Sequence, residues 1–522
     1  MAPIALMRKI SRREFLAGLS ALGTLVPEKL AAARAPAQAI SIVRPPSLQS
    51  MRPDGVTVMW ATLQPGTGYV RYATNGSRPG LARARRRTYF PNETGMPFAY
   101  EQYQADLVGL KSNRQYVYSA MVNAQQVGDA ASCHFRTAGP GPLDFLVFGD
   151  SGQATPEQSA IASRMALEHP SFVLHVGDIA YMDGSFAQFH SNYFRYYSGL
   201  MSCVPFFTSP GNHEYMTNNA AAYLALQSVP QRTVPINDWG RYYSFDWGNA
   251  HFVSLDSNAS LEQAVEGTGR MLAWLENDLK LTRAFWRIVF FHHPPYATGL
   301  NQGDIKSAWA REKIVPILER YGVHVVFSGH EHSYHRSHPV RDNTTTTQGD
   351  GTLYITSGGG GASLYPVFAH PLLAVSQSRH HYIRAEMRGL QLTLRAVGID
   401  GSEIDNVVVR PAPAIESTNL SPMLWRSVLL MRGTRVQIFG RGFASEEGST
   451  SKTVFQLAGA AVTINDRPIS LLYVSPNRID AFVSFRISGA ATLRVTTPNG
   501  SSETVVSLPD EWSLNNARSL SR

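Results

Sequence analysis

The sequence predicts an α/β core flanked on each side by a segment of short strands. Residues 141–410 alternate apolar strand patterns with helical patterns, which is typical of strand–helix–strand units whose helices pack outside a sheet. Residues 40–140 and 411–510 instead show short alternating strands between turns rich in glycine, proline and asparagine. Hydrophobic residues make up 43% of the 522 residues and charged residues 16%, so the chain is not expected to be mainly disordered.

The first 39 residues carry the three parts of an export signal. Basic residues come first, the apolar run from Phe15 to Val26 follows, and small residues lead to Ala37-Gln38-Ala39. The run is too short to span a bilayer. Arg12 and Arg13, which stand shortly before Leu16, resemble the twin-arginine signal. We therefore expect export by that route to the periplasm or the medium, with membrane contact only in transit.

The leader also carries half of the formal net charge of +8, so residues 40–522 are only mildly basic. This charge gives little support to a nucleic-acid partner, and none is expected. Cys133 and Cys203 are too few for a disulfide framework or a cysteine-rich zinc ribbon. Whether the two cysteines form a bridge stays open, as does the oligomeric state.

The N-terminal segment, residues 40–140, is predicted to be a β-sandwich. Val56, Val58 and Trp60 alternate within Gly55–Thr62, and Tyr116-Val117-Tyr118 repeats the pattern. This arrangement looks like a fibronectin type III domain.

The C-terminal segment, residues 411–510, shows the same kind of alternation, for example over Arg435–Phe439 and Thr492–Thr496. Its Gly440-Arg441-Gly442-Phe443 resembles a turn of immunoglobulin-like IPT/TIG domains. The tail at residues 511–522 is expected to be loose.

The central segment, residues 141–410, is predicted to hold five apolar strands that are followed by loops or helices. Thr155 is predicted to cap a helix that begins at Pro156, with Gln158 at the capping-box position. Another helix is predicted over Ile305–Arg320, and a third has Met271, Leu275 and Leu279 on its buried face. The five strands are expected at Asp144–Gly149, Ser171–Val176, Ala250–Leu255, Trp286–Phe291 and Val323–Phe327.

Five short motifs lie at or beyond the ends of predicted strands, which is where α/β sheets bind ligands. They are Gly149-Asp150-Ser151-Gly152, Gly177-Asp178-Ile179-Ala180-Tyr181, Gly211-Asn212-His213-Glu214, Val289-Phe290-Phe291-His292 and Gly329-His330-Glu331-His332. Each motif alone is weak, because such aspartates are usually turn residues and such histidines usually core residues. Together they offer carboxylate, phenolate, amide and imidazole donors without a thiolate, a set that suits iron, zinc or manganese. With Asp178 as a bridge they suit two ions, which can clamp the attacking and leaving oxygens of a displacement.

This pattern resembles the metallophosphoesterases and, more narrowly, the purple acid phosphatases. Generic metallophosphoesterases place a metal-binding histidine two residues after the first aspartate, where this chain has Gly152. A tyrosine instead stands three residues after the second aspartate, at Tyr181, as in purple acid phosphatases. The resemblance covers roughly residues 40–410 and implies a four-layer α/β/β/α core.

The resemblance also implies a role for each site residue. A ferric ion would be held by Asp150, Tyr181 and His332. A divalent ion, which can be zinc, iron or manganese, would be held by Asn212, His292 and His330. Asp178 would bridge the two ions. His213, together with Asn212, would face the substrate phosphate and help protonate the leaving oxygen, and His293 is a further candidate for substrate binding.

The function that follows is an exported acid phosphatase that hydrolyses phosphate monoesters by attack of a metal-activated hydroxide on phosphorus. Two alternatives stay open. The same site can serve phosphodiesters or nucleotides, because substrate choice lies in loops such as Asp183–Ser202 and Met216–Gly240. The chain can also be a non-catalytic exported binding protein with a vestigial site. The presence of bound metal discriminates between the enzyme and such a binding protein.

Overall fold

The computed structural model describes residues 39–129, 134–258, 267–347, 349–426, 430–484 and 489–508. The predictions for the leader up to residue 38, for Cys133 and for the tail at 511–522 lie outside these ranges. None of the helices in the described ranges has the length and apolar character that a membrane span requires.

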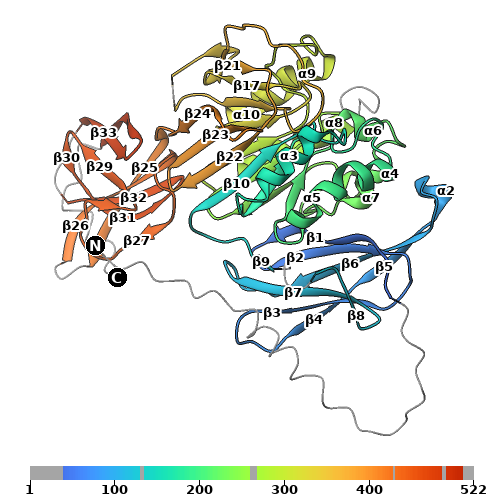
Figure 1. Ribbon diagram of the computed structural model, residues 1–522. Helices are drawn as coiled ribbons and strands as arrows, with labels where there is room; N and C mark the ends of the chain where they lie inside the picture. The colour runs from blue at the N-terminus through green and yellow to red at the C-terminus, as the bar shows by residue number, and fades with distance from the viewer. Residues whose placement is uncertain are drawn as a thin grey trace.

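The N-terminal strands form two sheets, which lie below the central part of the molecule in Figure 1. One sheet has the order β1-β2-β6-β5, with β1 at Ile42–Arg52, β2 at Gly55–Thr62, β6 at Tyr100–Val108 and β5 at Arg85–Tyr89. The other has the order β4-β3-β7-β8, with β4 at Gly80–Arg83, β3 at Gly68–Ala73, β7 at Gln115–Val122, β8 at Gln125–Val127, and β9 at His134–Arg136 paired to β7. The short helix α2 spans Pro91–Thr94.

Two larger sheets form the centre of the molecule. The six-stranded sheet has the order β12-β11-β10-β22-β23-β24, with these strands at Phe206–Thr208, Phe172–His175, Leu143–Phe148, His381–Arg388, Gln391–Gly398 and Glu403–Val409. The seven-stranded sheet has the order β13-β14-β15-β16-β20-β17-β21, with these strands at Tyr243–Trp247, Ala250–Ser254, Trp286–Phe290, Val325–Ser328, Leu353–Ser357, Tyr334–Ser337 and Leu373–Gln377. Strands β18 (Val340–Arg341) and β19 (Thr344–Thr345) form a small hairpin.

Helices cover the outer faces of these two sheets. The first group consists of α3 (Pro156–Met165), α4 (Phe186–Gln188), α5 (Arg195–Met201), α6 (Asn212–Tyr215) and α7 (Ala221–Leu226), with a π turn at Phe189–Phe194. The second group consists of α8 (Gly267–Leu281), α9 (Ile305–Trp309) and α10 (Val315–Arg320). A 3-10 turn spans Ile236–Asp238.

Alternation along single strands explains the four layers. In β10, Phe145 and Val147 face the core between the two sheets, whereas Leu146 and Phe148 face helices α3, α5 and α7. In β15, Ile288 likewise faces the other sheet. Val289, which lies on the opposite face of β15, packs with residues of α8 and α10. Strands buried on both faces have apolar runs, as β10 has from Phe145 to Phe148 and β15 from Ile288 to Phe290. The predicted four-layer α/β/β/α core is confirmed.

Two of the predicted helices differ in detail from the expectation. The Thr155 side chain accepts from Gln158 N as predicted, but the Gln158 side chain accepts from Ala154 N (2.8 Å) instead of closing a capping box on Thr155. The helix expected over Ile305–Arg320 is interrupted by a π turn at Ala310–Ile314. The predicted buried face of α8, which contains Leu275, is confirmed.

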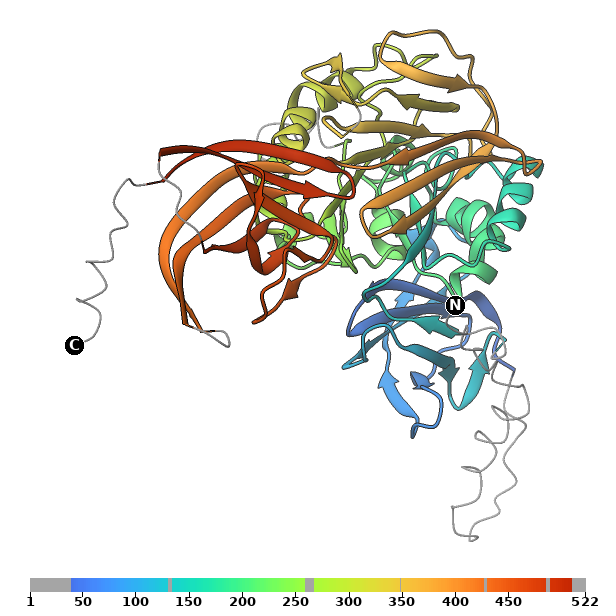
Figure 2. The ribbon, with the colours of Figure 1, turned by 90° about the vertical axis from the view of Figure 1, so that its left-hand side faces the viewer.

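The C-terminal strands form two further sheets, which lie to the left of the central sheets in Figure 1 and are the orange and red strands at the left of Figure 2. One has the order β25-β26-β32-β31-β27, at Ala414–Arg426, Leu430–Arg441, Arg478–Val483, Ser470–Ser475 and Gly448–Ser449. The other has the order β28-β29-β33-β34, at Gln456–Leu457, Ala460–Ile464, Gly489–Thr497 and Gly500–Leu508, with β30 (Arg467–Pro468) paired to β29. These sheets enclose a separate apolar core.

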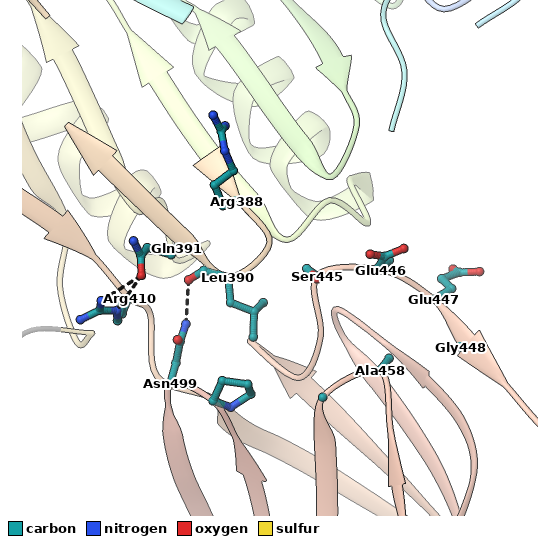
Figure 3. Close-up of a pocket in the computed structure, with 12 residues that line it drawn as sticks. Arg388, Leu390, Gln391, Arg410, Ser445, Glu446, Glu447, Gly448, Ala458 and Asn499 are labelled. Carbon is teal, nitrogen blue, oxygen red and sulfur yellow. Dashed lines mark hydrogen bonds between the residues drawn. The ribbon is translucent and has the colours of Figure 1, made fainter. Parts of the chain in front are cut away.

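A pocket of about 710 Å³ lies where the turn between β22 and β23 meets the C-terminal sheets (Figure 3). Arg388 and Arg410 line one side of this pocket, and Glu446 and Glu447 lie on the C-terminal side. Asn499 Nδ2 spans the junction by donating to the carbonyl O of Leu390 (2.8 Å). The twelve residues drawn in Figure 3 include no predicted metal ligand, so this pocket is separate from the predicted site.

Candidate metal centre

The five predicted motifs converge at one edge of the two central sheets. Strands β10, β11 and β12 are parallel neighbours, and so are β15 and β16. Parallel strands bring their carboxyl ends to the same edge, and each of these five strands leads directly into one motif. The ligand candidates that follow them in order are Asp150, Asp178, Asn212, His292 and His330.

Backbone strain is concentrated at this edge. Asp150, Asp178 and His330 adopt left-handed backbone conformations, with φ of 55°, 54° and 67°. Non-glycine residues in this region store free energy, about 1 kcal/mol or more each, and such residues cluster at functional sites. Close backbone packing also explains one feature of the sequence. A Cβ atom at Gly152 would lie 2.1 Å from the carbonyl O of Ile179, so a histidine does not fit there.

One half of the centre is built around the Tyr181 hydroxyl. Its oxygen lies 3.2 Å from Asp150 Oδ1, 3.0 Å from Asp178 Oδ2 and 3.0 Å from His332 Nε2. His332 Nδ1 donates to the carbonyl O of Ser363 (2.7 Å), which leaves Nε2 free to face the other donors. All four ligand candidates are buried. The structure thus brings together the residues predicted to hold the ferric ion.

The other half is built around His292. Its Nε2 lies 3.0 Å from Asn212 Oδ1 and 3.3 Å from Asp178 Oδ2, and its Nδ1 donates to the carbonyl O of Val176 (2.9 Å). The His330 ring centre is 5.1 Å from that of His292. Because Asp178 Oδ2 contacts both Tyr181 and His292, it occupies the position that a bridging carboxylate needs.

A third imidazole, that of His293, belongs to the same cluster. The ligand atoms of His292, His293 and His330 all lie within 4.8 Å of one another. His293 Nδ1 lies 2.7 Å from Ser257 Oγ, and burial lowers the pKa of His293 well below its ordinary value. A neutral imidazole this close to two ligand candidates can bind a metal, so His293 is a second candidate on this side as well as the substrate contact that the sequence suggested.

The pKa shifts of the ligand candidates favour a bound cation. Burial raises the pKa values of Asp150 and Tyr181 well above their ordinary values, so the anionic forms of both groups need a compensating charge. Burial lowers the pKa of His330 to about 3 and that of His332 to about 4, which keeps both imidazoles neutral, as ligation requires. A bound metal ion supplies the compensating charge and favours the phenolate of Tyr181.

Glu214 lies in the third motif, and no role for it was predicted from the sequence. Its buried carboxylate accepts from four backbone N–H groups: Asp178 N (3.0 Å), Ile179 N (2.8 Å), Ala180 N (3.1 Å) and Gly211 N (2.7 Å). These bonds fasten the loop after β11 to the loop after β12. The sequence signal was the glutamate two residues after Asn212, but its partners were not readable from spacing.

His213 faces the opening of the centre. Its Nε2 lies 3.7 Å from Asp178 Oδ2, its ring centre is 4.2 Å from that of Tyr181, and its Nδ1 contacts the carbonyl O of Met182. Its side chain is 16% exposed, whereas that of Asp178 is 2% exposed. The imidazole is therefore placed between the ligands and solvent, as a proton donor to substrate must be.

Lys306 was missed by the sequence reasoning. Its Nζ donates to Asn258 Oδ1 (3.2 Å), and Asn258 Nδ2 donates to the carbonyl O of Pro210 (3.1 Å), immediately before the Asn212 motif. Its positive charge contributes to the lowered pKa of His330. Nothing in the spacing marked this lysine, because it reaches the centre through a contact with a residue 48 positions away.

Comparison with known proteins agrees with this geometry. Residues 143–334 match the model of the calcineurin-like phosphoesterase family. Acid phosphatase type 7 of Mus musculus is 27% identical over 410 residues, which cover 69% of this chain and 89% of that protein. The Homo sapiens protein of the same name is 28% identical over 398 residues, with the same coverage.

Residues 143–334 are thus similar to the calcineurin-like phosphoesterases, and the chain is similar to proteins named acid phosphatases. The plant protein purple acid phosphatase 23 of Arabidopsis thaliana is 34% identical over 175 residues, which cover 32% of this chain and 36% of that protein. The structure of purple acid phosphatase PPD1 from yellow lupin shares the fold, with a TM-score of 0.62 at 20% identity over 70% of this chain and 74% of that one. The predicted enzyme class is confirmed.

Proposed function

We propose that the chain is an exported acid phosphatase that hydrolyses phosphate monoesters at a centre of one ferric and one divalent ion. The observation that carries the proposal is the position of the Tyr181 oxygen, within 3.2 Å of Asp150, Asp178 and His332. A phenolate among such donors favours a trivalent ion. Asn212, His292 and His330 form the second ligand set, for zinc, iron or manganese, and Asp178 belongs to both.

The residues of the chain then divide the work. When bound, the metal pair activates water and neutralises charge on the phosphoryl oxygens. Asn212 and His213 face the substrate phosphate, and Lys306 adds a positive charge on the His330 side of the centre. His213 gives its proton to the leaving oxygen, because its Nε2 lies 3.7 Å from Asp178 Oδ2 and its side chain is 16% exposed.

Export and monoester preference are parts of this proposal. Export is supported by the twin arginines, the apolar run and the small residues of the leader. Monoester preference is supported by the relatives, which are named acid phosphatases.

The deciding experiment compares an aryl phosphate monoester with the matching diester on purified, metal-loaded protein from acidic to alkaline pH. Faster monoester turnover with an acidic optimum is expected. Faster diester turnover would keep the site and overturn the substrate class. Absence of turnover of both esters, with both metals bound, would contradict the proposed function.

A further inference from the structure

Exposed apolar side chains gather on the loops that surround the candidate metal centre. In the described part of residues 143–410, nine large hydrophobic side chains are exposed. Five of them belong to loops or short helices at the ligand edge of the two sheets: Met182, Met216, Leu300, Ile305 and Phe368. Single exposed hydrophobic residues are ordinary, but five of the nine lie on loops or short helices at the one edge that carries the ligand candidates. We call these five residues the apolar rim.

Two rim residues are tied to the His213 side of the centre. Met182 directly follows Tyr181, and its carbonyl O contacts His213 Nδ1. Met216 N donates to the carbonyl O of His213 (3.2 Å). The thioether side chains of both residues are exposed, at 64% and 60%. The six-stranded sheet therefore contributes two flexible apolar groups next to the proposed proton donor.

The other three rim residues come from loops of the seven-stranded sheet. Leu300 N donates to Glu331 Oε1 (3.0 Å), and Glu331 stands between two ligand candidates in the sequence. Ile305 directly precedes Lys306. Phe368 N and O both bond to Thr298 Oγ1 (3.3 and 2.7 Å), and its loop also carries Tyr365, whose ring stacks on His332 with centres 4.0 Å apart. The rim thus reaches the centre from both sheets.

We propose that the apolar rim binds the organic group of the substrate, and that the enzyme prefers phosphate monoesters of apolar alcohols over sugar phosphates and nucleotides. The inference rests on the proposed phosphatase function of the centre. When the phosphate lies between the two ligand sets and Lys306, the organic group extends from the phosphate past His213. Met182 and Met216 are then the first rim residues that it contacts. Burial of an apolar group against hydrocarbon and thioether side chains favours binding of the substrate. A sugar at the same place would lose hydrogen bonds to water, because these side chains offer its hydroxyls no partners.

The test measures kcat/KM of the metal-loaded full chain for ethyl, butyl, hexyl and octyl phosphate. The alcohols differ little in acidity, so the rate of the chemical step should be the same for all four esters. Differences in kcat/KM then report contacts between the alkyl group and the protein. Each methylene that becomes buried should raise kcat/KM by about two- to fourfold. Glycerol 1-phosphate should fall below propyl phosphate. Comparison of 2-phenylethyl with hexyl phosphate decides between an aromatic and an aliphatic group.

Rim variants assign the effect to the named residues. Met182→Ser combined with Met216→Ser should reduce the hexyl-to-ethyl ratio of kcat/KM by about tenfold, because these two side chains lie beside His213. Leu167→Ser is the matched control, because Leu167 is 75% exposed at the end of α3 and outside the rim, and it should keep the ratio. Metal content and thermal midpoints show that each variant is folded and loaded.

The outcomes separate the inference from the function on which it rests. A flat series in which every ester is hydrolysed would overturn the apolar preference and leave the phosphatase standing. A ratio that is unchanged in the double variant would overturn the assignment to the rim. No turnover of any ester by metal-loaded protein would overturn the proposed function and the inference together.

Discussion

At the scale of single residues, the proposed roles make different demands on each side chain. His213 is placed to deliver a proton, which matters only when the leaving group is a poor one. Under the proposal, Tyr181 binds a ferric ion, and a phenolate ligand changes the visible spectrum of that ion. Each role can therefore be measured by a property that a merely structural side chain would not affect.

His213→Ala should retain both metals and slow the hydrolysis of alkyl phosphates by about 10²- to 10⁴-fold, the usual contribution of a general acid. Esters of acidic phenols should lose much less, because their leaving oxygen needs no proton. Metal analysis and kcat for the two ester types check this prediction. An equal loss for both types would assign His213 to binding and not to proton transfer.

Tyr181→Phe should abolish the visible absorption that a phenolate on ferric iron produces, since it removes the hydroxyl that lies 3.0 Å from Asp178 and from His332. The visible spectrum and the iron content of the same sample provide the measurement. Tyr365→Phe is the matched control, because the ring of Tyr365 stacks on His332 and should keep the colour. Colour that persists in Tyr181→Phe would refute the assignment.

At the scale of elements, the loops that follow neighbouring strands are held in register by buried polar groups. Glu214 connects the loops after β11 and β12, and His251 connects β13, β14 and α8. His251 Nδ1 lies 2.7 Å from Asp246 and its Nε2 lies 2.8 Å from Asp278. Neither connection is visible in the local sequence pattern, but both set how adjacent elements meet.

Glu214→Ala should lower the free energy of unfolding by about 3 kcal/mol or more, because four buried N–H donors lose their acceptor. Metal affinity should fall by about 10- to 100-fold, since the ligand loops lose their support. Denaturant unfolding and metal titration check both effects. Glu312→Ala, at a 70% exposed side chain, should change neither quantity, and equal behaviour of the two variants would contradict the role of Glu214.

The pH dependence of stability should show the His251 connection. Burial lowers the pKa of His251, but the hydrogen bonds to Asp246 and Asp278 outweigh burial and raise it to about 9. Because the folded pKa lies above the unfolded one, the contribution is fully present below about pH 6.5 and is lost as pH rises through 9. It amounts to on the order of 3 kcal/mol. Unfolding free energies from pH 6 to 10 should therefore fall more in the native protein than in His251→Phe; parallel curves would count against the ion pairs.

At the scale of the whole molecule, the flanking β-sandwiches relate differently to the central sheets. Leu48 and Trp60 of the N-terminal sheets share one continuous apolar core with Phe252 of the seven-stranded sheet. The Tyr118 hydroxyl also donates to the carbonyl O of Ser202 (2.8 Å). The C-terminal sheets have a core of their own and meet the rest at a junction bounded by the pocket of Figure 3.

A chain that ends at Arg410 should therefore keep its thermal midpoint and its metal content. Removal of residues 40–140 should instead expose the shared core and give insoluble or unfolded protein. Calorimetry and metal analysis of both truncated chains check this expectation. Unfolding of the chain that ends at Arg410 would show that the C-terminal sheets stabilise the centre.

Much of the fold was predictable because its determinants are local. The strands β10, β11 and β15 begin and end within one residue of the predicted boundaries, since a strand buried on both faces is mostly apolar. The Gln158 contact with Ala154 and the π turn after Trp309 were not predicted. Tertiary packing selects between alternatives of nearly equal local free energy at such positions.

The sequence by itself determined the kind of chemistry. The residue types of the motifs define the ligand atoms, and each motif follows a strand of the α/β core. The glycine in place of a histidine at position 152 and the tyrosine at position 181 could be read from the sequence, whereas the steric reason for Gly152 came from the structure. Only the tertiary structure decided that Glu214 fastens the loops, that Lys306 reaches the centre through Asn258, and that five apolar side chains are exposed on the loops at the ligand edge. These three features depend on contacts between residues that are far apart in the chain. The free energies of such contacts cannot be inferred from a local sequence pattern.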